Sequence, residues 1–189
     1  MDIGNFIERV LNNQSFGAFV GACAAFMLVV LNDWRRERKK VANICGEIEM
    51  NLDLANAKLE TVRRNRKALR KESRIIPAPI LKFNTLLIRQ LAAEVLGRLT
   101  LDQRRSLEAL CYTMEATDGI LEEVYALTKR AREPLEGVNL RSTVTTLGTE
   151  YDDAIVNLKR LSEMCQKYVA GRYRSITEKQ YDRSEYEES

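Results

Sequence analysis

Residues Phe16 to Leu31, FGAFVGACAAFMLVVL, form a continuous apolar stretch that contains no residue more polar than Gly or Cys. No charged residue occurs between Arg9 and Asp33. Sixteen helical residues extend roughly 24 Å, and with residues 10–15 the uncharged stretch is long enough for the ~30 Å hydrocarbon core of a bilayer. We therefore predict a transmembrane helix over residues 16–34.

The residues that flank this stretch favour an uncleaved helix over a secretory signal peptide. A signal peptide has a positive segment before its apolar run and a small-residue cleavage site after it. Here Asp2 and Glu8 precede the run, and Arg35 and Arg36 follow it. The alternative is a buried helix of a soluble bundle, in which short apolar runs also occur.

Basic residues are distributed unequally around the run, and this predicts its orientation. Arg9 alone precedes it. The residues that follow it form a membrane-surface cluster: Trp34, Arg35, Arg36, Arg38, Lys39 and Lys40. By the positive-inside rule, residues 1–15 lie outside the cell and the residues after the helix lie in the cytoplasm. We expect a single-pass protein of the inner (plasma) membrane, with the lipid bilayer as partner and the basic side chains against anionic headgroups.

Small residues follow a four-residue spacing within the apolar run, at Gly17, Gly21 and Ala25. This spacing allows the backbones of two membrane helices to approach closely, as in GxxxG-type association. It predicts a homo-oligomer held together partly by this face. The alternative is that these residues simply face lipid.

After the membrane segment the sequence predicts helices and no sheet, because no segment alternates polar and apolar residues with a period of two. A long helix over residues 35–74 continues from the membrane helix and ends before Pro77 and Pro79, which cannot join helical hydrogen bonding. Its apolar residues recur every seven positions, with three more placed four residues after the first members. They are Val41, Ile48, Ala55, Val62 and Leu69, with Cys45, Leu52 and Leu59.

Three further helices are predicted within residues 75–170. The first, over Leu86 to Leu99, is short, and the capping-box sequence from Thr100 to Gln103 opens the next, which reaches about Arg132. The last has the most regular apolar stripe, formed by Leu140, Val144, Leu147, Tyr151, Ala154, Leu158, Leu161, Cys165 and Tyr168. We expect an all-α fold, an antiparallel four-helix bundle followed by a flexible charged tail over residues 171–189.

Composition argues against most enzymes. The 189 residues include no histidine, which removes the commonest general base and the commonest neutral metal ligand. The four cysteines, at positions 23, 45, 111 and 165, form no C-x-x-C pair, and no glycine-rich phosphate loop or hydrolase motif is present. We predict a protein that is not an enzyme, with no metal and no cofactor.

The net charge of +3 conceals a concentration of thirteen basic residues against seven acidic ones between Asp33 and Arg74. Part of this excess lies ~40 Å along the long helix from the membrane-surface cluster, beyond the reach of headgroups if the helix stands upright. Together with two arginines that open the helix after Thr100, it predicts an anion-binding site. The candidate residues are Arg63, Arg64, Lys67, Arg70, Lys71, Arg74, Arg104 and Arg105. The alternative is a solvated helix end whose basic residues complement the helix dipole.

Two functions are compatible with these features. The first is a membrane-anchored, oligomeric cytoplasmic scaffold or sensor. The second is an effector gated by an anionic ligand, and in architecture alone the chain is similar to the membrane-perturbing effectors of prokaryotic antiviral defence that respond to cyclic nucleotides. The expected ligand is therefore an anionic nucleotide or an acidic protein. Nucleic acid is not expected, because no aromatic residues are interleaved with the basic ones.

Overall fold

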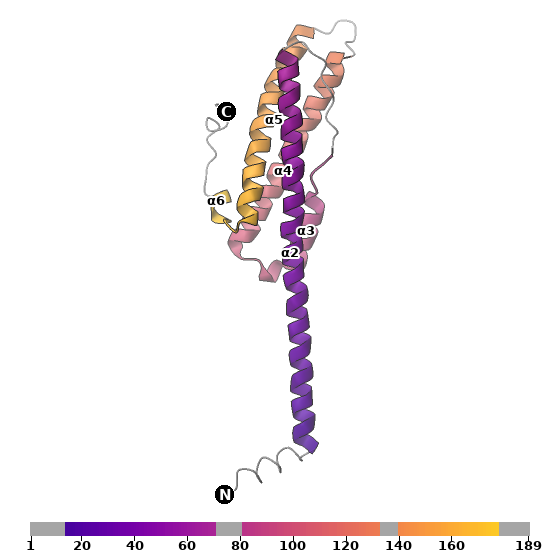
Figure 1. Ribbon diagram of the computed structural model, residues 1–189, viewed down its shortest axis with the longest axis vertical. Coiled ribbons are helices and arrows are strands. Elements are labelled where there is room, and N and C mark those ends of the chain that lie inside the picture. The colour runs from indigo at the N-terminus through magenta and orange to yellow at the C-terminus, as the bar shows by residue number, and fades with distance from the viewer. Residues whose placement is uncertain (1–13, 71–80, 133–139, 178–189) are drawn as a thin grey trace. The chain divides into compact units, whose positions relative to one another are not determined.

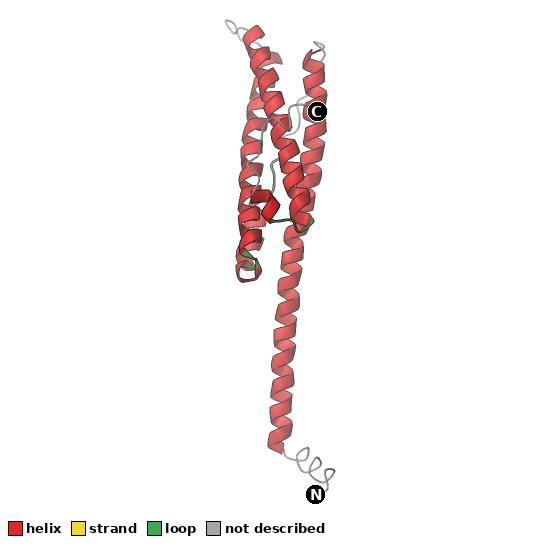
Figure 2. Ribbon diagram, turned by 90° about the vertical axis from the view of Figure 1, so that its left-hand side faces the viewer, coloured by secondary structure: helices red, strands yellow, loops and turns green. Residues whose placement is uncertain are grey.

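The computed structural model describes residues 14–70, 81–132 and 140–177, and every regular element in these ranges is a helix (Figures 1 and 2). The all-α prediction is therefore confirmed for the described part of the chain. The chain divides into two compact units, Met1–Ala42 and Asn43–Ser189. We call them the first and second units.

Helix α2 runs without interruption over Gln14–Arg70, a length of 57 residues. This confirms that the predicted membrane helix and the long helix after it form one element. An 18-residue window of this helix has a mean hydropathy of 1.6, and none of the window is buried inside the protein. By length and composition this helix can cross a membrane. The prolines predicted to end it lie outside the described residues.

The second unit also contains α3 (Thr85–Glu94), the short 3₁₀ helix η1 (Leu96–Arg98), α4 (Leu101–Arg132), α5 (Leu140–Val169) and α6 (Arg174–Thr177). Helix α4 begins with the predicted capping box. The Gln103 amide donates to the Thr100 hydroxyl (3.2 Å), and the Thr100 amide donates to the Gln103 side-chain oxygen (2.8 Å). Both orphan donors are thereby satisfied at the start of the helix.

Two elements differ from the sequence prediction. Helix α3 ends at Glu94 instead of Leu99, because Val95 leaves helical geometry and its amide bonds back to Ala92. The chain then forms η1 and turns so that Leu99 is buried. Residues 174–177, which we assigned to a flexible tail, form α6 with Ile176 buried, and residues 178–189 lie outside the described residues.

Helices α4 and α5 lie side by side, so that the end of one is next to the beginning of the other (Figure 1). Thr128 contacts Tyr151 (3.2 Å), while Thr113, nearer the start of α4, contacts Met164 (3.7 Å). The predicted stripe of α5 is buried from Leu147 to Tyr168, and its earlier member Val144 is 37% exposed. Removal of this apolar stripe from water provides the main stabilisation of the contact.

Helix α2 contributes a different stripe from the one that the apolar pattern indicated. Ile48, Ala55, Leu59 and Val62 are buried as expected, but Val41, Cys45, Leu52 and Leu69 are only half-buried. Their places in the core are taken by four residues seven positions apart: Ile44, Asn51, Lys58 and Asn65. Three of these four are polar, so the hydrophobic pattern alone did not reveal the buried face.

Candidate functional site

The predicted anion-binding face of α2 is exposed where the structure describes it. Arg63, Arg64 and Lys67 are all exposed, and Arg64 lies 3.3 Å from Glu60 one turn earlier. An ion pair of this kind is screened by water and contributes little to stability. The side chain of Arg70 and residues 71–80, which include Lys71 and Arg74, lie outside the described part.

Arg66 does not add to this basic face, because it is paired with a carboxylate of α5. Its Nε and Nη2 donate to the two oxygens of Asp152 at 2.9 and 2.7 Å, a bidentate pair that raises the pKa of Arg66. A Cβ added at Gly148 would lie 3.2 Å from Nη1 of Arg66, so this glycine allows the guanidinium to lie close to α5. Arg66 therefore joins α2 to α5 and is not part of a ligand site.

Lys159 of α5 adds a charge that the sequence analysis did not assign to the site. Its pKa is lowered by partial burial and by the positive charge of Arg63 on α2. The two cations therefore lie close enough to repel each other. The described basic surface thus consists of Arg63, Arg64 and Lys67 from one helix and Lys159 from another.

Arg104 and Arg105 are not brought to this surface. Arg104 donates to the carbonyl oxygens of Leu99 (3.1 Å) and Leu96 (2.5 Å), so it caps the turn before α4. Asp152, the partner of Arg66, lies ~25 Å along α5 from the end of that helix at Val169. The beginning of α4, which carries Arg104 and Arg105, lies next to the Val169 end of α5. The prediction that the two basic groups combine within one chain is therefore not supported by this geometry.

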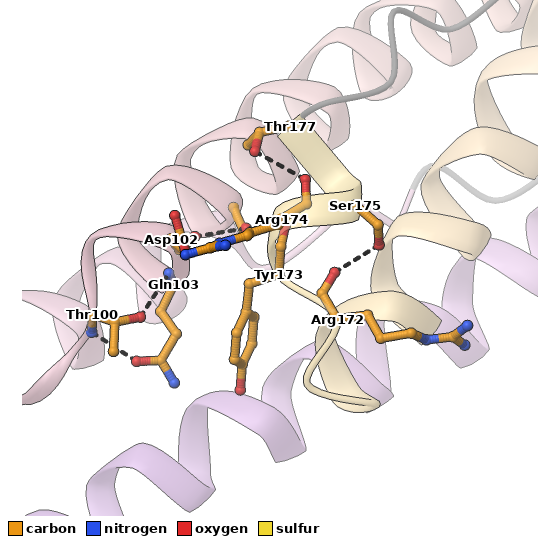
Figure 3. Close-up of polar contacts among 9 residues, drawn as sticks. Thr100, Asp102, Gln103, Arg172, Tyr173, Arg174, Ser175 and Thr177 are labelled. Atoms are coloured by element: carbon orange, nitrogen blue, oxygen red, sulfur yellow. Dashed lines mark hydrogen bonds and ion pairs between the residues drawn. The ribbon is translucent and has the colours of Figure 1, made fainter.

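The start of α4 forms a polar cleft with the turn after α5 (Figure 3). The cleft has a volume of about 500 Å³ and is lined by Thr100, Asp102, Gln103 and residues 171–175. Arg174 donates to Asp102 at 2.8 Å, and the Ser175 hydroxyl donates to the Arg172 carbonyl at 2.8 Å. These contacts are internal to the fold and leave the cleft without an evident catalytic group.

The membrane-surface cluster lies on α2 before the second unit begins. Trp34 is 43% exposed, and the guanidinium carbon of Arg38 lies 4.2 Å from the centre of its ring. A stacked Trp and Arg suit the interface between acyl chains and headgroups, since one is amphipathic and the other carries a charge. Arg35, Arg36 and Lys39 are exposed, and Lys40 is half-buried.

The small residues of the apolar stretch have no packing role within the single chain. Gly17, Gly21 and Ala25 are exposed, and a Cβ added at either glycine would meet no atom within 4 Å. This face of α2 is therefore open to lipid or to another helix. Its use in self-association stays a prediction.

Three buried polar residues of α2 were not singled out by the sequence analysis. Lys58 forms a buried ion pair with Asp118 of α4 (2.9 Å), and the Asn51 oxygen accepts the Asn84 amide proton (3.0 Å). Asn65 hydrogen-bonds the side chain of Tyr151. The signal that could have found them is their seven-residue spacing, which continues that of Ile44. Polar residues at such positions specify helix register in coiled coils.

Reactive chemistry is not evident among the described residues. Burial raises the pKa of the Cys111 thiol to about 11 and that of Cys165 to about 12, so both are protonated at neutral pH. No cluster of three or more Cys, Asp or Glu side chains in the described ranges could hold a metal ion. Cys45 also has a raised pKa, because it is partly buried and near Glu49.

Comparison with known proteins gives no match: no family model, no curated protein and no solved structure matches the chain. Function must therefore be argued from the residues themselves.

Proposed function

We propose that the protein is a non-enzymatic, membrane-anchored scaffold or sensor whose second unit is a cytoplasmic, antiparallel helical bundle. One observation about α2 supports this most directly. Large apolar side chains of its first half are exposed, for example Phe26 at 70% and Met27 at 67%, whereas Ile44 and Ile48 in its second half are buried. Apolar surface of that extent needs a cover, and a bilayer matches its length.

The charges after the span support the proposed topology. The membrane-surface cluster contains five basic residues from Arg35 to Lys40, and Arg9 alone precedes the span. The positive-inside rule then directs the second unit to the cytoplasm and the N-terminus outside. The open face at Gly17 and Gly21 supports self-association of the membrane helices, which would hold several second units together.

Two methionines of α2 provide a matched test of the anchor. Met27 and Met50 are 67% and 66% exposed in the single chain, but only Met27 lies within the apolar stretch. An arginine near the centre of a membrane helix costs about 2.5–3.5 kcal/mol of insertion free energy. Met27→Arg should therefore release protein from membranes washed with alkaline carbonate, and Met50→Arg should not. Equal retention of both variants would refute the proposal.

The orientation has its own test. In a variant that lacks the native cysteines, Asn5→Cys on intact cells should react with a membrane-impermeant maleimide, and Ser189→Cys should react only after lysis. The reverse pattern would contradict the proposed topology. Crosslinking in native membranes would measure self-association, and Gly17→Leu with Gly21→Leu should weaken it.

A second candidate function is an effector gated by an anionic ligand of the cyclic nucleotide type. The influence of the positive charge of Arg63 on the pKa of Lys159, which lies on a different helix, favours it, because an anion bound to both would be stabilised by the two charges. Gating requires the ligand to bind two states of the protein with different affinity. Cyclic AMP, cyclic di-AMP and inorganic phosphate are suitable probes of this surface in a thermal-shift assay.

The charge-neutralised variant for that assay is Arg63→Gln with Lys67→Gln and Lys159→Gln. A ligand-induced shift should disappear in this variant and persist in a control with Lys129→Gln and Arg130→Gln, which are exposed residues at the end of α4. The absence of a shift with every probe would argue against the effector and leave the scaffold function.

A further inference from the structure

Several elements of the second unit meet at the end where the unit begins with Asn43 of α2. Cys45, two residues after the boundary of the unit, lies close enough to Tyr168 of α5 to affect its pKa. The rings of Tyr168 and Tyr173 are 4.9 Å apart, and the Ser106 hydroxyl of α4 donates to the Tyr173 carbonyl. The beginning of α4 and the turn after α5 are therefore at this end (Figure 1).

Two leucines at this end of the second unit are exposed, although a leucine between them in the sequence is buried. Leu96 of η1 is 50% exposed and Leu101 in the first turn of α4 is 59% exposed, while their neighbour Leu99 is buried. Arg104 holds the two leucine-bearing turns together, because it donates to the carbonyls of Leu96 and Leu99 and follows Leu101 by one turn. The exposed leucines thus belong to one ordered corner of the unit.

The two segments that meet at this end of the unit are rich in basic residues. Residues 94–105 and 167–174 contain six basic and two acidic residues, and the acidic Asp102 is paired with Arg174. Arg105 lies one helical turn after Leu101 on the same face of α4 and is exposed. Arg172 is also exposed, and its side chain extends away from the Asp102–Arg174 pair (Figure 3).

Few residues separate the beginning of the second unit from the membrane-surface cluster in the sequence. Asn43, where the second unit begins, follows Lys40 by three residues and Trp34 by nine. Even fully extended, nine residues span at most roughly 32 Å, so the proposed membrane anchor would keep the beginning of the unit within that distance of the bilayer surface. Exposed leucines with arginines nearby in the sequence, on a unit tethered by so short a connection, are suited to insertion between anionic headgroups.

We propose that Leu96 and Leu101, with Arg105 and Arg172, form a second membrane contact that docks the end of the helical unit on an anionic lipid surface. The proposal rests on the membrane anchorage proposed above. The leucines would enter the headgroup region, and the two arginines would pair with lipid phosphates or carboxylates. Docking would restrain the unit at two places, the α2 connection and the corner formed by η1 and α4.

Tryptophan fluorescence tests this contact in the full-length protein. Trp34 is the single tryptophan, so Trp34→Phe gives a silent background. In this background, Leu101→Trp should be quenched by brominated phospholipids in vesicles that contain phosphatidylserine. The control is Tyr112→Trp, an exposed position on α4 that lies ~17 Å further along the helix and should not be quenched.

A third reporter separates failure of docking from failure of anchorage. Val29→Trp in the same background lies within the apolar stretch and should be quenched in every vesicle that the protein enters. Quenching of Val29→Trp without quenching of Leu101→Trp would overturn the docking proposal alone. No quenching at either position would overturn the anchorage on which it depends.

Two further measurements test the role of the arginines and the possibility that a second copy of the chain covers the leucines. Arg105→Gln and Arg172→Gln should each lower the ratio of docked to undocked protein about five-fold in anionic vesicles. Equal quenching of Leu101→Trp in purely phosphatidylcholine vesicles would overturn the role of the arginines. A blue-shifted Leu101→Trp emission that brominated lipid does not quench would show that a second copy of the chain covers the leucines, and this would also overturn the proposal.

Discussion

The buried ion pair between Lys58 and Asp118 gives the sharpest prediction about the stability of the second unit. The two side chains are 7% and 12% exposed, and Lys58 Nζ lies 2.9 Å from Oδ1 of Asp118. The other carboxylate oxygen accepts the Phe83 amide proton at 2.9 Å, and the Lys58 ammonium lies 4.1 Å from the centre of the Phe83 ring. One carboxylate thus holds α2, α4 and the 81–84 segment together.

Replacement of Asp118 by Asn removes the charge and keeps an oxygen that can accept the Phe83 amide proton. The Lys58 ammonium then stays buried without its counter-charge. Loss of one partner of a buried pair costs about 3–5 kcal/mol, and we expect about 3 kcal/mol here because the Phe83 ring still faces the ammonium. This is a large fraction of the ~5–15 kcal/mol that stabilises a typical domain.

Urea unfolding of the full-length protein in detergent, followed by far-UV circular dichroism, measures the effect. The double variant Lys58→Met with Asp118→Asn should recover to within about 1 kcal/mol of the original chain, because no buried charge remains. The coupling energy from the double-mutant cycle should be about 2–3 kcal/mol. Additive costs, with no recovery in the double variant, would refute the reasoning.

A neighbouring ion pair supplies the control. Lys82 lies 2.7 Å from Glu122, but its side chain is 68% exposed. Lys82→Met should therefore cost less than about 1 kcal/mol, since water screens an exposed pair. If it costs as much as Asp118→Asn, burial is not what makes the Lys58 pair important.

Three further predictions concern a helix cap, a link between helices and the buried thiols. Thr100→Ala should destabilise the fold by about 1 kcal/mol, because the cap of α4 loses its hydroxyl acceptor. Arg66→Ala should cost about 1 kcal/mol, because a bidentate but half-exposed pair with Asp152 is lost, and the denaturation midpoint should fall accordingly. Cys111 and Cys165 should react with iodoacetamide at pH 8 only after the protein is unfolded. Above pH 9, the free energy of unfolding should fall by up to about 1.4 kcal/mol per pH unit for each of these two thiols.

The sign of the pH effect follows from the folded and unfolded pKa values. In the unfolded chain both thiols lose their protons near pH 9, while in the fold they keep them until about pH 11 and about pH 12. Rising pH therefore favours the unfolded chain across that range. A free energy of unfolding that is constant from pH 9 to 11, or rapid alkylation of the folded protein, would contradict the prediction about the two thiols.

Thr100→Ser is the control for Thr100→Ala, and Arg64→Ala is the control for Arg66→Ala. Both controls should change the free energy of unfolding little.

The helices of this protein could be predicted from the sequence where they depend on residues that are close to one another in the sequence. The capping box at Thr100, the start of α4 and the stripe of α5 from Leu147 to Tyr168 were all predicted and are confirmed. Each depends on residues within one or two helical turns, so the local pattern carries the necessary information. The uninterrupted α2 is a property of the same kind, since it contains no proline and only three glycines.

The candidate site was predictable only in part. The sequence predicted a basic face that includes Arg63 and Lys67, and the structure shows that the neighbouring Arg66 does not add to it, because Asp152, 86 residues later in the sequence, binds Arg66. The same packing adds Lys159 to the surface. A cluster of like charges indicates a basic region, but the counter-charges that remove members from it come from distant parts of the chain.

Local sequence was sufficient to predict helices in the described part of the chain, one apolar stretch long enough for a membrane, and the start of α4. Tertiary structure alone decided which face of α2 is buried, because Asn51, Lys58 and Asn65 can enter a core only when distant partners satisfy them. Lys58 and Asp118 are 60 residues apart, and nothing local to either indicates the other. The physical reason is that an unpaired polar group in a core is costly, so its burial depends on contacts that only the complete fold creates.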